Sequence, residues 1–269
     1  MAVRRTEEYV LGLIANGKRL DNRELDEFRE IEIKTGVSKK AEGSAEVRIG
    51  NTRVIAGVKM DIGEPFPDTP DKGILITNAE FLAMAAPEFE PGLPGEDAIE
   101  LARVVDRGIR ESGSIDFEKL CIVEGEKVWM VFVDIFVVNH DGNLIDAANL
   151  AAVAALLNTK VPALSEDQEE VIRDEYTMDL PMKDIPIAVT FRKHGNRILV
   201  DTTALEEDVI PGKLTITTKA NGNITAIQLS GGVAFKKDEI IKCAKMSQEI
   251  GKRIREEHFK EEMKKLNLL

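Results

Sequence analysis

The spacing of apolar residues in the first third of the chain changes from helical to strand-like. Between residues 4 and 18, apolar side chains recur every three or four positions, which predicts a helix that ends at Asn16-Gly17. Residues 28–62 alternate between apolar and polar side chains and predict several strands, with a hairpin turn at Gly50-Asn51. Six of the ten prolines fall within residues 63–95, around the apolar segment ILITNAEFLAMAAP, which predicts one strand between long surface loops.

The middle of the chain contains two predicted helices of opposite character. Residues 96–112 (EDAIELARVVDRGIRES) predict an amphipathic helix, with two acidic residues in its first turn and Gly113 after its last turn. Residues 126–147 (EKVWMVFVDIFVVNHDGNLIDA) predict a long hairpin that turns at Asp141-Gly142-Asn143. The hairpin leads into a helix, AANLAAVAALLN, that has no polar face, so we expect this helix to be buried under a sheet.

The C-terminal part begins with a polar stretch and then repeats the succession of strands and a helix. Residues 165–175 are acidic and polar and predict a linker. Hairpin turns are predicted at residues 194–196 and 221–223, followed by an amphipathic helix from about Asp238 to Glu262. Each half of the chain therefore reads as β-hairpins followed by a helix. This pattern predicts an α+β fold with two related lobes, residues 1–185 and residues 186–269.

The composition is that of a globular protein from a reducing compartment. The 269 residues are 43% hydrophobic and contain no run of 18 apolar residues, so we expect a normal core and no membrane association. The N-terminus lacks a signal-peptide pattern and the two cysteines lack CxxC spacing, which indicates a cytoplasmic protein. The formal net charge of −12 disfavours nucleic-acid binding over the whole surface but allows it at a local basic patch.

Few patterns in the sequence are typical of a catalytic or metal site. The three histidines, at positions 140, 194 and 258, lack the spacing of zinc ligands, and we expect them in turns and on the surface, with no metal or other cofactor. An acidic group, Glu206-Glu207-Asp208 with Asp201 upstream, has two interpretations. It could bind Mg²⁺ or supply a general base, or it could be a solvated loop, which is the commoner role of such runs.

Three arginines are the best candidates for a binding function. Arg103, Arg107 and Arg110 fall within an arc of about 60° on the predicted helix 96–112. Its apolar residues lie on the opposite arc and should face the core. A stripe of this kind can bind successive phosphates along a single strand. The alternative is a solvated face in which the arginines pair with Glu100 and Asp106.

Four segments of the chain together resemble the RNase PH family. They are RLDNRELDEFREIEI, AEGSAEVRIGNTRVIAGV, ELARVVDRGIRES and VDIFVVNHDGNLIDAANLAAVAAL. Their order and spacing match the family over nearly the whole chain, although no single segment is diagnostic. The resemblance implies a duplicated, ribosomal S5-like α+β sandwich that assembles into six-lobed rings. It also implies a part in 3′→5′ RNA degradation by phosphorolysis, in which inorganic phosphate attacks the terminal linkage.

Two positions depart from the pattern of the active family members. Those members carry Gly-Ser-Arg or Gly-Thr-Arg before the buried helix, where the arginine binds phosphate, and here the tripeptide is Gly142-Asn143-Leu144. Asp146, near the helix start, would repel an anion and serve as a helix cap. Active members also carry an aspartate about six residues after a Glu-Asp pair, whereas Gly212-Lys213-Leu214 follows Glu207-Asp208 here. Asp201 and Asp208 do resemble the upstream acids of the family.

The resemblance is therefore to the non-catalytic RNase PH-like subunit of the archaeal exosome core. Such a subunit alternates with a catalytic one in a hexameric ring and helps to form its neighbour's active site. Its expected partners are that catalytic subunit, RNA and the cap proteins of the exosome. By resemblance, Arg103 and Arg107 lie at the subunit interface and bind RNA phosphates, and Arg110 is the weaker candidate. Two alternatives remain: an active phosphorolytic 3′-5′ exoribonuclease with a rearranged site, and a ring scaffold without an RNA role.

Overall fold

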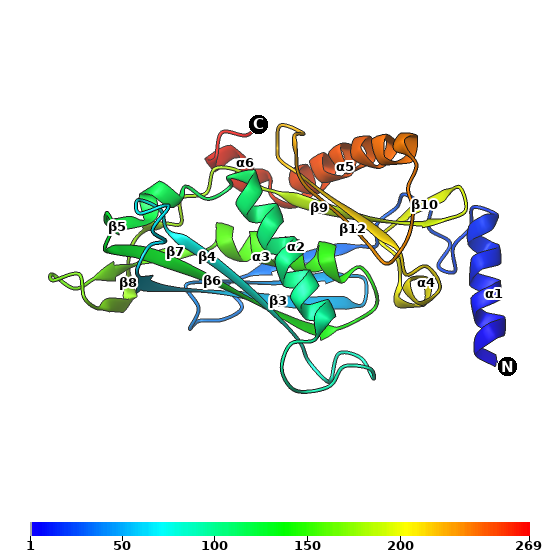
Figure 1. Ribbon diagram of the computed structural model, residues 1–269, viewed down its shortest axis with the longest axis horizontal. Coiled ribbons are helices and arrows are strands. Elements are labelled where there is room, and N and C mark those ends of the chain that lie inside the picture. The colour runs from blue at the N-terminus through cyan, green and yellow to red at the C-terminus, as the bar shows by residue number, and fades with distance from the viewer. Residues whose placement is uncertain (1) are drawn as a thin grey trace.

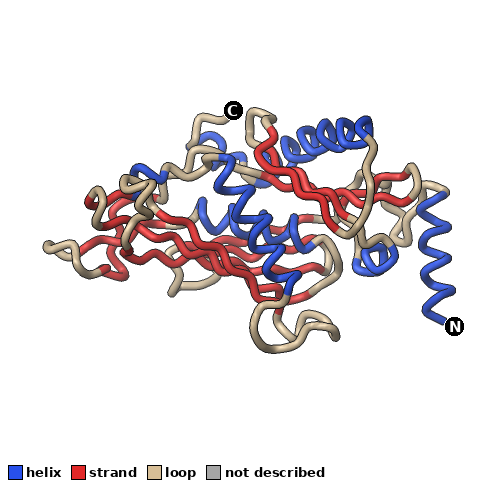
Figure 2. Tube along the Cα trace, in the orientation of Figure 1, coloured by secondary structure: helices blue, strands red, loops and turns tan. Residues whose placement is uncertain are grey.

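Two β-sheets and the helices between and above them form the layers of the molecule (Figure 1, Figure 2). The computed structural model describes residues 2–269 and the side chains of residues 7–269. A six-stranded sheet is the lower layer in Figure 1, and α2 (Glu96–Ser112) and α3 (Leu144–Leu157) lie above it. A four-stranded sheet packs against these two helices, and α5 (Lys237–His258) covers the outer face of that sheet. The predicted α+β class is confirmed.

The first sheet is built from strands whose alternating apolar residues face α3. Its strands are β1 (Ile31–Thr35), β2 (Gly43–Ile49), β3 (Thr52–Gly63), β4 (Ile74–Phe81), β5 (Cys121–Val123) and β6 (Lys127–Asn139). The order is β1-β2-β3-β6-β4, with β5 also paired to β6; the β4–β6 pair is parallel and the others are antiparallel. The predicted turn at Gly50-Asn51 joins β2 to β3, and β4 is the strand predicted within residues 63–95. A 3-10 helix, η1 (Phe117–Leu120), precedes β5.

The hairpin predicted over residues 126–147 is wrong. β6 continues as one strand to Asn139, and the chain then turns directly into α3 at Leu144. The turn contains two left-handed residues, Gly142 with φ 81° and Asn143 with φ 54°. Left-handed residues end a strand before a helix as readily as before a second strand, so the turn signal alone does not distinguish the two cases.

The second sheet contains both of the C-terminal hairpins that the sequence predicts. Its strands are β9 (Ile187–His194), β10 (Arg197–Val200), β11 (Lys213–Thr218) and β12 (Ile224–Ser230). They are antiparallel in the order β10-β9-β11-β12, and a short helix, α4 (Ala204–Val209), connects β10 to β11. One edge of this sheet, β12, lies against α2.

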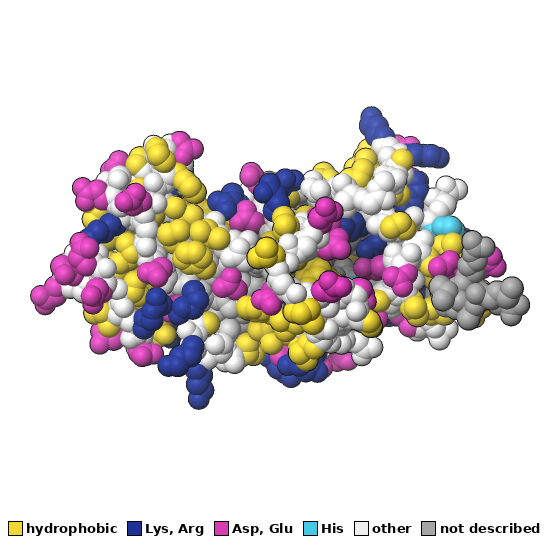
Figure 3. All heavy atoms as spheres, turned by 60° about the horizontal axis from the view of Figure 1, so that its bottom comes forward, with side chains coloured by type: hydrophobic (Ala, Val, Ile, Leu, Met, Phe, Trp, Pro, Cys, Tyr) yellow, Lys and Arg dark blue, Asp and Glu magenta, His cyan; other side chains and the backbone are white. Residues whose placement is uncertain are grey.

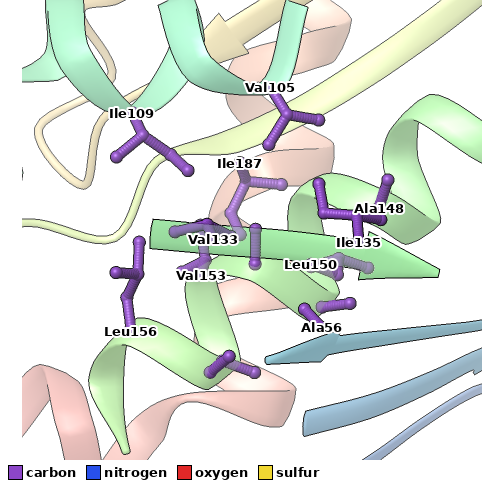
Figure 4. Packing of buried hydrophobic residues seen from close by; sticks show 14 of the residues in the cluster. Ala56, Val105, Ile109, Val133, Ile135, Ala148, Leu150, Val153, Leu156 and Ile187 are labelled. Atoms are coloured by element: carbon purple, nitrogen blue, oxygen red, sulfur yellow. The ribbon is translucent and has the colours of Figure 1, made fainter. Parts of the chain in front are cut away.

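Helix α3 is the centre of the hydrophobic core, as its uniformly apolar sequence predicts. Every residue from Ile145 to Leu156 is buried. Figure 4 shows Leu150 and Val153 of α3 close to Val133 and Ile135 of β6. Contacts with β2, β3 and β6 on one side and with β9 and α2 on the others leave no direction in which a polar side chain would reach solvent. Each fully buried leucine or valine stabilises this core by about 1.5–3 kcal/mol.

Two C-terminal predictions need correction. The predicted linker, residues 165–175, is only partly irregular, because β8 (Val171–Asp179) pairs with β7 (Lys160–Leu164) in a two-stranded ribbon. All residues of β8 after Val171 are exposed, and Arg173, Asp174 and Glu175 make its first half as polar as the loop before it, so the sequence there is typical of a linker. The final helix is interrupted at the buried residue Phe259 and continues as α6 (Lys260–Lys265).

The N-terminal helix packs against the C-terminal part of the chain. Helix α1 (Ala2–Ala15) ends at Asn16-Gly17 as predicted, and it contacts α4. Val10 and Ile14 of α1 form a small apolar cluster with Leu199 and Ile210. The two sheets draw on residues 31–139 and 187–230, and the division into lobes 1–185 and 186–269 stays a prediction. Across residues 2–269, no helix is long and apolar enough to cross a membrane.

Candidate functional site

The turn before α3 is closely packed against the second half of the chain. A Cβ atom on Gly142 would lie 2.1 Å from the carbonyl oxygen of Thr202, so only glycine fits at this left-handed position. His140 Nδ1 accepts a hydrogen bond from the Gly142 amide at 3.2 Å, which agrees with the turn role predicted for this histidine. The tripeptide Gly142-Asn143-Leu144 thus forms a rigid turn with no basic side chain of its own.

A carboxylate of the chain itself faces the positive end of α3. The amide of Asn143, the residue that precedes the helix, donates a hydrogen bond to Glu207 Oε1 at 2.9 Å. Thr202 Oγ1 donates to the same oxygen at 2.9 Å, and Arg192 pairs with Glu207 Oε2 at 3.0 Å. Glu207 therefore satisfies donors that would otherwise attract an external anion.

Asp146 does not cap α3, contrary to the prediction from sequence. Its carboxylate is fully buried and accepts hydrogen bonds from the Thr190 amide (3.0 Å) and the Thr190 hydroxyl (2.7 Å) on β9. Burial raises the pKa of Asp146 to about 7, against the lowering effect of the Thr190 hydrogen bonds. The residue holds α3 to the second sheet, and the αL conformation of Asn143 begins the helix without a side-chain cap.

Asp201 is fully buried and lies at the centre of a cluster of partly buried basic side chains. Its carboxylate accepts hydrogen bonds from Arg29 Nη2 at 2.7 Å, Arg23 Nη1 at 2.9 Å and Asn143 Nδ2 at 2.8 Å. Burial alone would raise the pKa of Asp201, but the hydrogen bonds and the charge of Arg29 lower it below its ordinary value. Asp201 thus connects the N-terminal segment to the turn before α3.

Two of the three carboxylates of the acidic run, Glu206 and Glu207, form ion pairs with arginines of the chain. Glu206 is buried in a two-pronged ion pair with Arg19, with distances of 2.9 and 2.6 Å to its two oxygens. Asp208 is the member of the run that is exposed. Among residues 2–269, no group of three or more His, Cys, Asp and Glu side chains is placed to bind a metal ion. The solvated-loop interpretation is wrong for Glu206 because a distant arginine compensates its charge.

A cavity of about 350 Å³ opens beside the turn. Its wall includes Leu144, Arg192, Asp208 and Lys213. Lys213 occupies the region in which the family resemblance leads one to look for an aspartate, and its Nζ pairs with Glu100 Oε2 at 2.7 Å. Both basic side chains in the wall are therefore engaged with carboxylates of this chain.

The three arginines lie on the exposed face of α2, as predicted. Arg103, Arg107 and Arg110 are all exposed. The opposite face of the helix is buried, including the predicted core residues Ala98, Leu101, Ala102, Val105 and Ile109. Two surface hollows, of about 320 and 310 Å³, flank the stripe, and both are lined by Arg103 and Arg107.

The arginines of this stripe differ in how their charges are compensated. Arg110 pairs with Asp106 at 2.9 Å and donates to the carbonyl oxygen of Leu75 on β4 at 2.9 Å. Arg107 Nη1 donates instead to the neutral amide oxygen of Gln228, at 3.2 Å. Arg103 forms no ion pair with any carboxylate in the part of the chain whose side chains are described. The predicted pairing with Asp106 is thus confined to Arg110, and Glu100 pairs with Lys213.

Sequence reasoning missed the basic cluster formed by Arg19, Arg23 and Arg29. These residues lie in the segment RLDNRELDEFREIEI, which carried only the family resemblance. Their buried carboxylate partners, Glu206 and Asp201, are 172 to 187 positions away in the chain. Nothing local marks these arginines as partners of distant acids, because the same segment contains six acidic residues beside its three arginines.

The fold and both halves of the chain match one protein family. Models of the 3′ exoribonuclease (RNase PH) family match residues 27–162 with domain 1 and residues 184–250 with domain 2. The chain therefore belongs to the RNase PH family and has its two-domain fold. This confirms the resemblance drawn from the four sequence segments.

Individual proteins of known sequence or structure are similar to this chain over most of its length. The chain is 54% identical over 235 residues to exosome complex component Rrp42 of Thermococcus gammatolerans, covering 86% of each chain. It is 50% identical over 245 residues to Rrp42 of Methanothermobacter thermautotrophicus, covering 91% of this chain and 90% of the relative. Among solved structures, a chain of the Archaeoglobus fulgidus exosome with RNA bound to the active site superposes with a TM-score of 0.89 and 49% identity, covering 95% of this chain and 98% of that one. A chain described as archaeal exosome core has a TM-score of 0.84 and 47% identity, covering 95% and 97% of the two chains.

Proposed function

We propose that this chain is a non-catalytic subunit of the hexameric RNase PH ring of an archaeal exosome. In the ring it alternates with a catalytic RNase PH-like subunit, helps to form that neighbour's active site, and contributes to a platform for cap proteins and RNA. The identities of 54% and 50% to archaeal exosome components, over most of each chain, support this assignment. We expect the complex to act in the cytoplasm.

The absence of catalysis by this chain alone is inferred from the turn before α3. The turn supplies an asparagine and a leucine where an active member supplies an arginine for phosphate. The amide of Asn143 donates to Glu207, so a carboxylate of this chain already uses a donor that a phosphate would need, and Lys213 stands where the active members carry the downstream acid. Phosphorolysis requires both the bound phosphate and its stabilising donors in place.

RNA binding is inferred from one observation: two neighbouring arginines on α2 that form no ion pair with any carboxylate among residues 7–269. Arg103 and Arg107 are four residues apart, one turn of the helix, and line the same two hollows. Exposed guanidinium groups at this spacing suit bidentate contacts with successive phosphates and carry no preference for base sequence. Arg110 is a weaker candidate because Asp106 already pairs with it.

The test uses rings assembled with the catalytic subunit and measures RNA affinity at several salt concentrations, without phosphate. Each phosphate contact on a single strand contributes about 0.7 to the salt slope, so Arg103→Glu with Arg107→Glu should flatten the slope by roughly 1.4. The control, Lys245→Glu with Arg253→Glu on the exposed face of α5, makes the same charge change away from the stripe. Equal slopes for the stripe and control variants would contradict RNA binding by α2.

The same material distinguishes the other two functions. Phosphate-dependent release of nucleoside diphosphates by the purified chain alone would show an active exoribonuclease. Normal ring assembly combined with unchanged RNA affinity in the stripe variant would show a scaffold without an RNA role.

A further inference from the structure

We infer that Gln228 is a positioning residue that aims Arg107 at RNA, an inference that rests on the proposed function of α2. Gln228 lies on β12, the edge strand of the second sheet, and its Oε1 accepts a hydrogen bond from Arg107 Nη1 at 3.2 Å. The two residues are 121 positions apart in the chain. Both line the hollow of about 320 Å³ that also contains Arg103.

The hydrogen-bond partner of Arg107, the amide of Gln228, is neutral, and the positioning role depends on this neutrality. An amide oxygen restricts the guanidinium to one orientation and leaves its positive charge intact, whereas a carboxylate would cancel the charge. Among the acids of α2, Asp106 pairs with Arg110 and Glu100 pairs with Lys213. Glu111, which is one turn from Arg107 and lines the hollow of about 310 Å³ with it, forms no ion pair with it. The surroundings of Arg107 therefore fix its direction without neutralising it.

The contrast with Arg110 divides the stripe into two roles. Arg110 bonds to both oxygens of Asp106 and to the carbonyl oxygen of Leu75, so it ties α2 to β4 of the first sheet. Arg107 ties α2 to the second sheet through a single hydrogen bond, which uses one of the five N–H donors of a guanidinium. The remaining donors of Arg107 stay available for a phosphate. Arg110 is a structural clamp, and the pair Arg103 and Arg107 is the contact for RNA.

Two substitutions at Gln228 should produce different signatures. Gln228→Ala releases Arg107 but keeps its charge, so RNA affinity should fall about 2- to 10-fold, the cost of ordering one long side chain on binding, with the salt slope unchanged. Gln228→Glu keeps the contact but pairs Arg107 with a carboxylate, so affinity should fall and the salt slope should flatten by about 0.7. A residue that merely supported the fold would not separate affinity from salt dependence in this way.

The experiment measures fluorescence anisotropy of labelled oligoadenylate with rings assembled from the full chain and the catalytic subunit. It compares the two Gln228 variants in the wild-type and Arg107→Ala backgrounds, with Gln248→Ala as the control. Gln248 is an exposed glutamine that bonds to the Gly222 carbonyl oxygen, away from the stripe. We expect both Gln228 effects to disappear when Arg107 is absent and Gln248→Ala to bind as wild type.

The possible results distinguish a failure of the positioning role of Gln228 from a failure of RNA binding by α2. If Arg107→Ala weakens RNA binding while Gln228→Ala and Gln228→Glu bind as wild type, the positioning role is overturned and the RNA-binding role stands. If the Gln228 effects persist in the Arg107→Ala background, Gln228 acts by another route and the inference also fails. If Arg107→Ala itself leaves affinity and salt slope unchanged, the proposed RNA-binding function of α2 is what fails.

Discussion

Replacing Asp146 with asparagine should remove a specific part of the pH dependence of folding stability. The carboxyl group of Asp146 is fully buried between α3 and Thr190 of β9, and burial raises its pKa from 3.8 to about 7. A raised pKa in the folded state means that the neutral acid stabilises the fold. That contribution is complete below the unfolded value of 3.8 and is lost as the pH rises to about 7.

The size of this contribution follows from the shift itself. Each unit of pKa corresponds to about 1.4 kcal/mol, so the difference between 3.8 and about 7 amounts to about 4 kcal/mol over the whole window. Between about pH 5 and pH 8, which avoids the titration of ordinary carboxylates, roughly 3 kcal/mol of it should be lost. Asparagine reproduces the neutral acid, because its oxygen accepts from the Thr190 amide and its nitrogen donates to the Thr190 hydroxyl.

The assay is urea unfolding of the wild-type chain and Asp146→Asn at a series of pH values. The free energy of unfolding of wild type relative to the variant should fall by roughly 3 kcal/mol from pH 5 to pH 8, since all other titrating groups cancel in the comparison. Asp208→Asn, a change of an exposed aspartate near the same turn, should show no such trend against wild type. A wild-type-to-variant difference that stays constant across the range would refute the reasoning.

Three further predictions concern the same region. Glu206→Gln should lower the free energy of unfolding by about 3–5 kcal/mol, because it leaves the buried Arg19 without its partner; urea unfolding beside Glu261→Gln, an exposed pair, is the comparison. Gly142→Ala should cost about 1–3 kcal/mol, since the new methyl group meets the Thr202 carbonyl oxygen at a φ of 81°; thermal melting would measure it, and an unchanged midpoint would argue against the tight turn. Leu144→Arg should not make the purified chain release nucleoside diphosphates from RNA and phosphate, because Lys213 still replaces the downstream acid; turnover above the wild-type background would disprove this.

The amino-acid sequence by itself determined which segments form the layers of the fold. The uniformly apolar run after Asn143 can only be stable where every side is covered, and α3 is buried on every side. The alternation in β2 and β3, the turn at Gly50-Asn51 and the amphipathic pattern of α2 are local properties of the chain, and the structure follows them. The absence of a phosphate-binding arginine before α3 was also visible in the sequence, because in the active family members that arginine belongs to the turn tripeptide itself.

Only the tertiary structure decided which charges meet. Asp146 looked like a helix cap from its position, but packing against Thr190 placed it in the core and changed its pKa. The sequence allowed Asp201 and Glu206 to be part of a metal or general-base site or of a solvated loop, but arginines from the N-terminal segment pair with both of them.

The three arginines of α2 show the same limit most clearly. A helical wheel places all three on the same face and does not distinguish them, because the periodicity of one helix carries no information about the elements packed around it. Their partners come from that helix, from β4 and from β12, so Arg110 is compensated, Arg107 is directed by Gln228 and Arg103 is left uncompensated by any described carboxylate. Hydrophobic periodicity is a short-range property that a sequence displays directly, whereas the pairing of charges depends on distances between segments that folding alone brings together.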